Sequence, residues 1–182
     1  MSKLQGVEWE VLASRIMRGL LARRGWDYRR LAEALTGSGH DLSHKAVDHK
    51  IQRGSFECAF FLHSMHIIGA SHPPQWRKAL RTAGNWNIRA SHVLRYEMAR
   101  WPGVDWQELS HRLATIGVAV TDDFLQQKVS AGSYPLTLLL QYASVFWVEG
   151  IEMLVDRDDL RAACRPISPP PAYLPFDDEI SS

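Results

Sequence analysis

The chain has 182 residues, of which 46% are hydrophobic and 23% are charged, a composition that provides enough apolar side chains for a buried core. The formal net charge of +1 selects no class of partner, and the two cysteines, Cys58 and Cys164, are far apart in the sequence and show no disulfide or zinc spacing. The amino-terminal residues lack the apolar core of a signal peptide, and no run approaches the roughly 18 apolar residues of a membrane span. We therefore expect a cytoplasmic protein without a membrane partner.

A segment of about 60 residues occurs twice in the chain. The copies begin at Trp9 and Trp86 and end in KIQRGSF, residues 50–56, and KVSAGSY, residues 128–134. An offset of 77 residues aligns their first halves, and one additional residue near Pro102 raises the offset to 78 for the rest. The duplication indicates two small helical domains, or one domain with internal pseudo-symmetry. We define the first copy as 8–70, the connector as 71–85 and the second copy as 86–150, followed by 151–182.

The first copy opens with two predicted helices. Apolar residues at helical spacing predict the first helix from about Glu8 to Arg24, and Gly25 closes it as a C-terminal cap. Asp27 is a suitable N-cap for the second helix, predicted over residues 28–35. Residues 36–42 contain two glycines, so we expect a turn there.

Two more helices complete the first copy. Ser43 is expected to cap the third, which ends before Gly54. Its inward residues are predicted to be Ala46, Val47 and Ile51. Ser55 can cap the fourth helix, predicted over 56–68, which is apolar almost all round and therefore expected to be central.

The rest of the chain repeats this order without any strand signal. Its predicted helices lie near 86–100, 105–116, 121–131 and 133–148, with shorter ones at 75–82 in the connector and 158–164 after the second copy. The remaining residues are rich in proline and acidic, and we expect them to be extended or disordered. The predicted fold is all-α.

The first copy resembles a family of small bacterial domains that have a leading Trp, a YxxLAxxL helix and a KIxRGxF segment. Here these are Trp9, YRRLAEAL at 28–35 and KIQRGSF at 50–56. That family is similar to lambda-repressor-like (Cro/C1-type) domains, in which LA recurs in the second helix, as Leu31–Ala32, and RG follows the recognition helix, as Arg53–Gly54. The resemblance implies two tandem lambda-repressor-like helix-turn-helix domains. The gap of about seven residues between the second and third helices exceeds the standard turn.

If the third helix is a recognition helix, its outward side chains should reach base edges or phosphates. Lys and Arg contact guanine or phosphate, Gln pairs with adenine, and His does either according to its protonation. The start of the second helix is suited to the DNA backbone. The predicted DNA-binding residues are Arg29, Arg30, Ser43, His44, Lys45, His49, Lys50, Gln52 and Arg53. The alternative is an ordinary solvated helix face.

The second copy differs in charge. The positions that match His44, Lys45, Asp48, His49, Gln52 and Arg53 hold Asp122, Asp123, Gln126, Gln127, Ser130 and Ala131. Residues 9–70 carry nine Lys/Arg against six Asp/Glu, whereas 86–150 carry five against six and 151–182 carry three against seven. Comparable DNA affinity is therefore not expected of the second copy. Its aromatic residues suit core packing or an interface: Trp101, Trp106, Phe124, Tyr142, Phe146 and Trp147.

The sequence predicts no catalytic, metal or cofactor site. Cys58, His63 and His66 lie in one predicted helix, but no further ligand completes a zinc set. No nucleotide-binding, hydrolase or metalloprotease motif occurs. We therefore expect a nucleoid-associated transcription regulator rather than an enzyme, with double-stranded DNA as its partner. A homodimer, or a protein bound through the second copy or the acidic tail, would be a further partner. The alternative is a protein-interaction adaptor that does not bind DNA.

Overall fold

The computed structural model describes residues 3–38 and 42–164, with side chains from Glu8 onward. Ten α-helices and two short 3-10 helices make up its regular structure, and these residues form no strand beyond one isolated bridge. The all-α prediction is confirmed. The predicted extended segment, 165–182, lies outside the described residues, as do residues 39–41 of the predicted turn.

Each copy supplies four helices in the same order. The first copy contains α1 (Lys3–Arg23), α2 (Tyr28–Gly37), α3 (His44–Arg53) and α4 (Cys58–Ile67). The connector contains η1 (Pro74–Trp76) and α5 (Arg77–Leu80). The second copy contains α6 (Trp86–Ala99), α7 (Trp106–Thr115), α8 (Asp122–Ala131) and α9 (Leu136–Val145), followed by η2 (Ile151–Met153) and α10 (Arg157–Ala163).

The predicted caps of the second and third helices are confirmed in the first copy and recur in the second. The Asp27 carboxylate accepts a hydrogen bond from Arg30 N at 2.7 Å, and the Ser43 hydroxyl accepts one from Ala46 N at 3.2 Å. Asp105 and Thr121, one offset of 78 residues later, cap α7 and α8 in the same way. These side chains satisfy backbone N–H groups that the first turn of a helix leaves unpaired, so both copies keep them.

The predicted start of the fourth helix is wrong in both copies. α4 begins at Cys58, with Glu57 rather than Ser55 at its cap position, and α9 begins at Leu136 and ends at Val145. The preceding residues are extended because they pair with each other across the molecule. Cys58 N donates to Tyr134 O at 2.9 Å, and Leu136 N donates to Phe56 O at 3.0 Å. The two bonds join matching residues of the copies, so they are related by the pseudo-symmetry.

Other predicted boundaries shift by smaller amounts. α1 begins at Lys3, before the predicted Glu8, and Gly37 is the last residue of α2 rather than part of a turn. The predicted connector helix is divided into η1 and α5, because Pro74 occupies the first position of a 3-10 turn.

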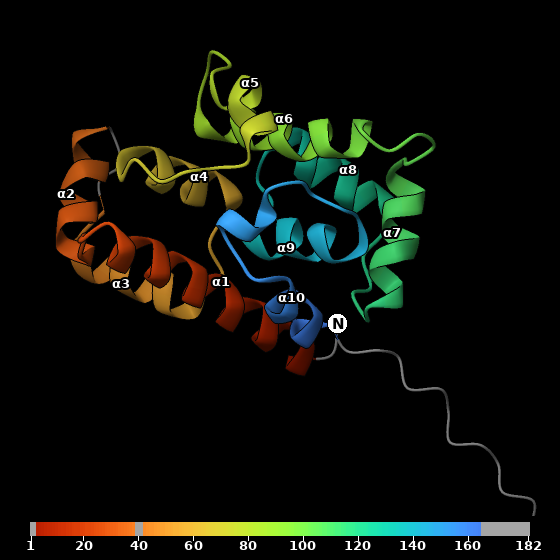
Figure 1. The fold of residues 1–182 in the computed structure, drawn as a ribbon, viewed down its shortest axis with the longest axis horizontal. Helices are drawn as coiled ribbons and strands as arrows, with labels where there is room; N and C mark the ends of the chain where they lie inside the picture. The colour runs from red at the N-terminus through yellow and green to blue at the C-terminus, as the bar shows by residue number, and fades with distance from the viewer. Residues whose placement is uncertain (1–2, 39–41, 165–182) are drawn as a thin grey trace, which may run out of the picture.

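The fourth helices are exchanged between the copies. α4 packs against α6 of the second copy, α9 packs against α1 of the first, and α4 and α9 contact each other. They lie between α1–α3 on one side of the view and α6–α8 on the other (Figure 1). One hydrophobic cluster includes buried residues of both copies and of the connector, among them Trp9, Phe56, Trp76, Leu94 and Leu139. These contacts favour the second alternative from the sequence, one unit with internal pseudo-symmetry.

Gly54 and Gly132 close α3 and α8 at matching positions. Both have a positive φ, 68° and 66°, a conformation that favours glycine. A Cβ atom at Gly54 would overlap the carbonyl of Glu10 in α1, and one at Gly132 would overlap the carbonyl of Asn87 in α6. The glycine of each KIQRGSF-type segment therefore allows the end of the third helix to approach the first helix of the same copy.

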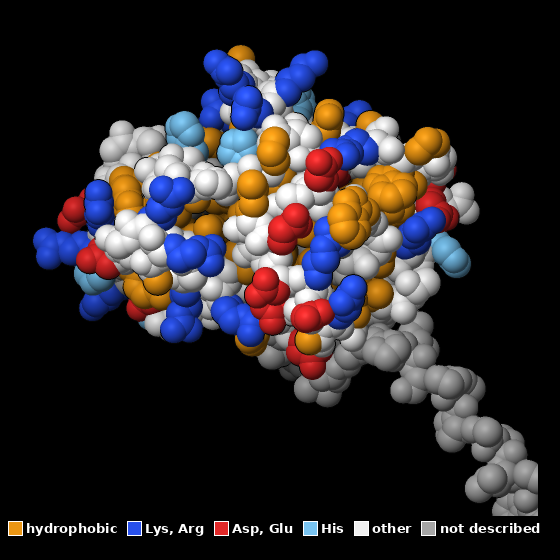
Figure 2. Space-filling model, viewed as in Figure 1, with side chains coloured by type: hydrophobic (Ala, Val, Ile, Leu, Met, Phe, Trp, Pro, Cys, Tyr) orange, Lys and Arg blue, Asp and Glu red, His pale blue; other side chains and the backbone are white. Residues whose placement is uncertain are grey.

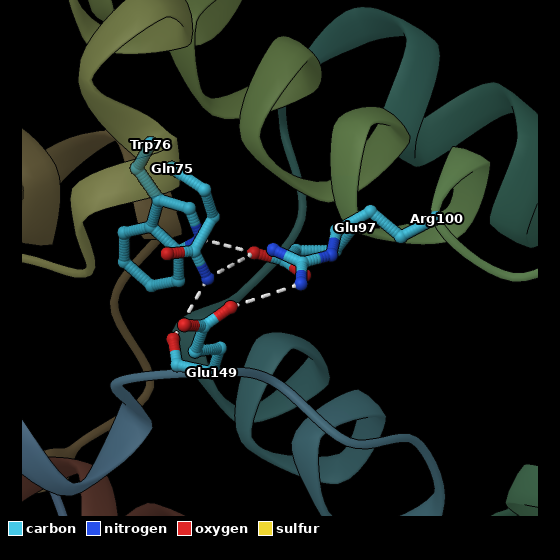
Figure 3. A network of polar contacts seen from close by, with 5 residues as sticks. All are labelled: Gln75, Trp76, Glu97, Arg100 and Glu149. Carbon is cyan, nitrogen blue, oxygen red and sulfur yellow. Dashed lines mark hydrogen bonds and ion pairs between the residues drawn. The ribbon is translucent and has the colours of Figure 1, made fainter.

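The connector is anchored to the second copy by a partly buried polar network (Figure 3). Trp76 Nε1 and Gln75 Nε2 donate to Glu97 Oε1 of α6 at 2.6 and 3.0 Å, and Gln75 Nε2 also donates to Glu149 O at 2.7 Å. Arg100 pairs with the Glu149 carboxylate at 3.1 Å. Glu97 is fully buried, and this burial raises the pKa of its carboxyl above the ordinary value.

Candidate nucleic-acid interface

Helix α3 is fixed by two side chains on its inner face. Val47 and Ile51 are fully buried, as predicted, and the helix packs against α1 and α2. The prediction that Ala46 points inward is wrong, because Ala46 is exposed. The buried line runs through Val47, Ile51 and Gly54, at spacings of four and three residues, and this line leaves Ala46 on the solvent side.

The structure places the nine predicted contact residues on one part of the first copy, at the start of α2 and along α3 with its cap. Eight are exposed: Arg29, Arg30, Ser43, His44, Lys45, His49, Gln52 and Arg53. Lys50 is half-buried, with its ammonium 5.4 Å from the centre of the Phe60 ring of α4. Lys and Arg side chains also gather over the α1–α3 side of the molecule in the space-filling view (Figure 2).

Some of these side chains already have local partners. Arg29 forms an exposed ion pair with Glu33 at 3.1 Å, Arg30 lies over the Trp26 ring at 4.0 Å, and Gln52 donates to Asp48 at 2.8 Å. Within the described part of the chain, Lys45 and Arg53 form no ion pair. These two cations are therefore the ones most available to an added polyanion.

Helix α8 repeats the packing of α3 with a different exposed face. Leu125 and Val129 are fully buried at the positions that match Val47 and Ile51. The first turn exposes Asp122 and Asp123 in place of His44 and Lys45. Lys128 is half-buried, as Lys50 is, but its ammonium lies 5.8 Å from the ring of Phe124 in its own helix. The two copies therefore position equivalent surfaces that differ in charge.

The aromatic residues of the second copy divide between core and surface. Tyr142 and Phe146 are buried and stack with ring centres 4.9 Å apart, and Trp106 is half-buried. Trp101, Phe124 and Trp147 are exposed. Core packing therefore accounts for some of these rings, and the other three lie where a partner could contact them.

Sequence reasoning missed a cavity beside the start of α2. Arg15 and Arg18 of α1 and Trp26 and Tyr28 line this space of about 680 Å³. Arg15 pairs with Asp159 of α10 at 2.7 Å, and Arg18 is exposed on the same side of α1. The signal in the sequence is the three-residue spacing of the arginines, which places them on one helix face. They extend the cationic surface from α2 toward α1.

Two neighbouring buried groups of the interior, the Cys58 thiol and the Tyr134 hydroxyl, have raised pKa values. Burial raises the pKa of the Cys58 thiol to about 12 and raises that of the neighbouring Tyr134 hydroxyl, so both stay protonated at neutral pH. Over residues 8–38 and 42–164, no three His, Cys, Asp or Glu side chains gather as metal ligands. None of the described helices has the length and apolar composition to cross a membrane.

The family described as Domain of unknown function (DUF6471) matches two segments, residues 9–73 and 86–151. The segments follow the two copies closely and together cover more than half of the chain. No curated protein and no solved structure matches the chain. The chain therefore belongs to the DUF6471 family and carries two tandem copies of its domain.

Proposed function

We propose that the protein is a sequence-specific, double-stranded DNA-binding transcription regulator whose first copy reads DNA through α3. The observation that carries this proposal is the exposed face of α3, which presents Lys45, His49, Gln52 and Arg53. Buried apolar residues on the other side of the helix fix its position. The order and packing of α2 and α3 also support a lambda-repressor-like helix-turn-helix in each copy.

In this proposal the contacts divide between recognition and positioning. Gln52 and Arg53 reach base edges, where Gln pairs with adenine and Arg with guanine. Arg29 and Arg30, at the start of α2, contact phosphates, and the missed Arg18 extends these contacts along α1. Lys50 supports the helix through Phe60 and contributes charge more than base contacts.

The second copy positions the first rather than binding DNA strongly. Asp122 and Asp123 favour the positive end of their own helix but repel phosphates. Its exposed rings, Trp101 and Trp147, suit dimerisation or recruitment of a protein. A regulator of this kind acts at the nucleoid in the cytoplasm. A homodimer would place two α3 helices on two half-sites.

A gel-shift and genome-wide recovery experiment tests this function. Wild-type protein should retard duplex DNA at low salt and recover a defined set of genomic sites, and Lys45→Ala/Lys50→Ala/Arg53→Ala should lose both. Because Lys50 lies against Phe60, the double variant Lys45→Ala/Arg53→Ala separates lost charge from lost packing. Lys128→Ala, the matching change in α8, is the control and should bind normally. Undiminished binding of the triple variant would exclude α3 as the recognition helix.

The second candidate is a protein-interaction adaptor that uses this scaffold without DNA. The exposed Trp101, Phe124 and Trp147 favour it, because aromatic residues are enriched at protein interfaces. The same gel shift discriminates between the two functions. No retardation at low salt, with random or genomic duplex, would favour the adaptor.

A further inference from the structure

A second cavity lies under the connector, where the two copies meet. It has a volume of about 320 Å³ and is lined by α4, by the residues that follow it, by α5 and by the start of α6. Its apolar wall includes Leu62, Met65 and Trp86, and its cationic groups are Arg77 and Arg81. Lys and Arg side chains gather at the top of the view over α5, beside His side chains (Figure 2). A small apolar pocket with a few polar groups is the usual form of a small-molecule site.

A pseudo-equivalent cavity of about 260 Å³ lies beside α9 and α10 and shows what such arginines contact in this fold. The segment RKALR at 77–81 in α5 aligns with RDDLR at 157–161 in α10, so Arg77 matches Arg157 and Arg81 matches Arg161. Arg157 lies 3.3 Å from the centre of the Trp147 ring and pairs with Glu152 at 3.6 Å. Arg161 pairs with Asp158 at 2.9 Å. Each arginine of this cavity therefore has a carboxylate, and one also has an aromatic ring.

The cavity under the connector lacks these partners. Gly69 stands at the position that matches Trp147, and Lys78 replaces Asp158. The connector contains no acidic residue, and neither Arg77 nor Arg81 forms an ion pair with any described carboxylate. The space is therefore open, apolar on one side and positively charged on the other.

The Trp86 ring is a preorganised part of the lining of the cavity under the connector. His63 of α4 stacks on Trp86 with ring centres 4.7 Å apart and planes 18° apart, and the Arg89 guanidinium lies 4.3 Å from the centre of the same ring. These contacts hold the indole in place without a ligand. The His66 ring also lies against it, with ring centres 5.3 Å apart. A flat ring that entered the cavity would meet the part of the indole that lines it, which these contacts already hold in one orientation, and this lowers the entropic cost of binding.

We propose that the cavity lined by Trp86, Arg77 and Arg81 binds a small aromatic carboxylate. The ligand ring takes the place that Trp147 has in the pseudo-equivalent cavity, and its carboxylate pairs with arginines whose counterparts, Arg157 and Arg161, pair with Glu152 and Asp158 outside that cavity's lining. Its carboxylate pairs with Arg77 and Arg81, and its ring packs against Trp86, Leu62 and Met65. A cavity of about 150 Å³ already accommodates a benzene ring, so the volume suits a single-ring acid. This inference does not rest on DNA binding.

Fluorine NMR with 4-fluorophenylacetate as the probe tests the site. Wild-type protein should bind it saturably, and the uncharged 4-fluorophenylacetamide should bind at least about tenfold more weakly, as expected for loss of a charge-assisted contact. Cyclohexylacetate, which keeps the charge but lacks the flat ring, should compete poorly. Equal binding of acid and amide, or no saturable binding of the acid, would overturn the proposal without the need for any variant.

Paired variants place the probe in the cavity. Arg77→Gln/Arg81→Gln should weaken binding of 4-fluorophenylacetate about tenfold or more, whereas Lys78→Gln, on the same short helix but outside the cavity lining, should change it less than about twofold. The probe should also shift the Trp86 indole N–H signal of the wild-type protein, assigned by its loss in Trp86→Phe. Shifts confined to other tryptophans, or equal effects of the Lys78 and arginine changes, would contradict this location.

Discussion

Helices α3 and α8 bury the same face of the same scaffold and expose different charges. Val47 and Ile51 in α3, and Leu125 and Val129 in α8, are fully buried at matching positions. The solvent side of α3 begins with His44 and Lys45, whereas α8 begins with two aspartates. Packing constrains the buried positions in both copies, and the exposed positions are free to diverge. The repeat therefore preserves a scaffold and differs on its surface.

The exchange of the fourth helices limits how independent the copies can be. α4 packs on α6 of the second copy as well as on α2 of its own, and α9 packs on α1 of the first copy as well as on α7 of its own, so each fourth helix joins the two copies. A change in one copy therefore affects the core that both share, while a surface change affects only one. The predictions below use this distinction.

Alanine at the two matching glycines should have the largest effect. Gly54→Ala and Gly132→Ala each combine a positive φ with overlap of a backbone carbonyl, and each should lower the free energy of unfolding by about 3 kcal/mol or more. Gly25→Ala is the matched control, because Gly25 also has a positive φ but no atom within 4 Å of a Cβ. It should cost only about 1 kcal/mol in urea unfolding. Similar costs for all three would argue against the helix contacts described for α3 and α8.

The second prediction concerns Glu97, whose matching residue in the first copy is the apolar Leu20. Burial raises the pKa of Glu97 in the folded protein, so the folded state binds more protons than the unfolded state once the pH exceeds the ordinary value of about 4.3. This contribution to stability is full below that pH and is lost as pH rises through the raised pKa. Glu97→Gln should remove the loss, so its stability relative to wild type should improve as the pH rises from 4 to 7.

Urea unfolding across this pH range measures the Glu97 effect. Glu33→Gln, which changes an exposed carboxylate that pairs with Arg29 in α2, far from this network, is the control and should leave the pH-dependent difference in place. If the free energies of unfolding of wild type and Glu97→Gln change with pH in parallel, the pKa of Glu97 does not differ between the folded and unfolded states, which would contradict this prediction.

A smaller difference separates Tyr134 from Phe56 at the matching position. The buried Tyr134 hydroxyl donates to Ala90 O at 2.7 Å, a bond that the phenylalanine of the first copy cannot form. Tyr134→Phe should cost about 1 kcal/mol in thermal or urea unfolding, the usual contribution of a neutral hydrogen bond. Tyr28→Phe, a half-buried tyrosine of α2, should change stability by less than about 0.5 kcal/mol. If Tyr134→Phe is as stable as wild type, this hydrogen bond makes no net contribution to the free energy of unfolding.

The helices and caps could be predicted because they depend on local chemistry. Asp27 and Ser43 are good caps followed by apolar residues at helical spacing, and Gly25 and Gly54 mark helix ends, so the sequence alone indicates these elements. The face of α3 follows from the same periodicity, except at Ala46, where a small apolar residue is equally suited to solvent. The contact residues predicted on α3 were chosen by residue type and by their place on that face.

The exchange of helices and the buried Glu97 could not be predicted in this way. α4 is apolar almost all round, so its sequence does not indicate which copy it contacts. Phe56 and Cys58 pair with residues about 78 positions away, and local propensity contains no information on such a contact. Glu97 lies in the polar segment RYEMAR of α6 and becomes buried only because Trp76 of the connector covers it. The cavity under the connector depends on the same long-range packing.

The salt dependence of DNA affinity tests the central claim, that α3 and not α8 carries the DNA-binding surface. Fluorescence anisotropy would measure the dissociation constant for a recovered genomic duplex at several salt concentrations. Lys45→Ala/Arg53→Ala should weaken binding and reduce the slope of log affinity against log salt by about 1, for the lost phosphate contact of Lys45, because Arg53 contacts a base edge; Lys128→Ala should leave both unchanged. An unchanged slope in the α3 variant, or an equal loss from the α8 control, would contradict the account.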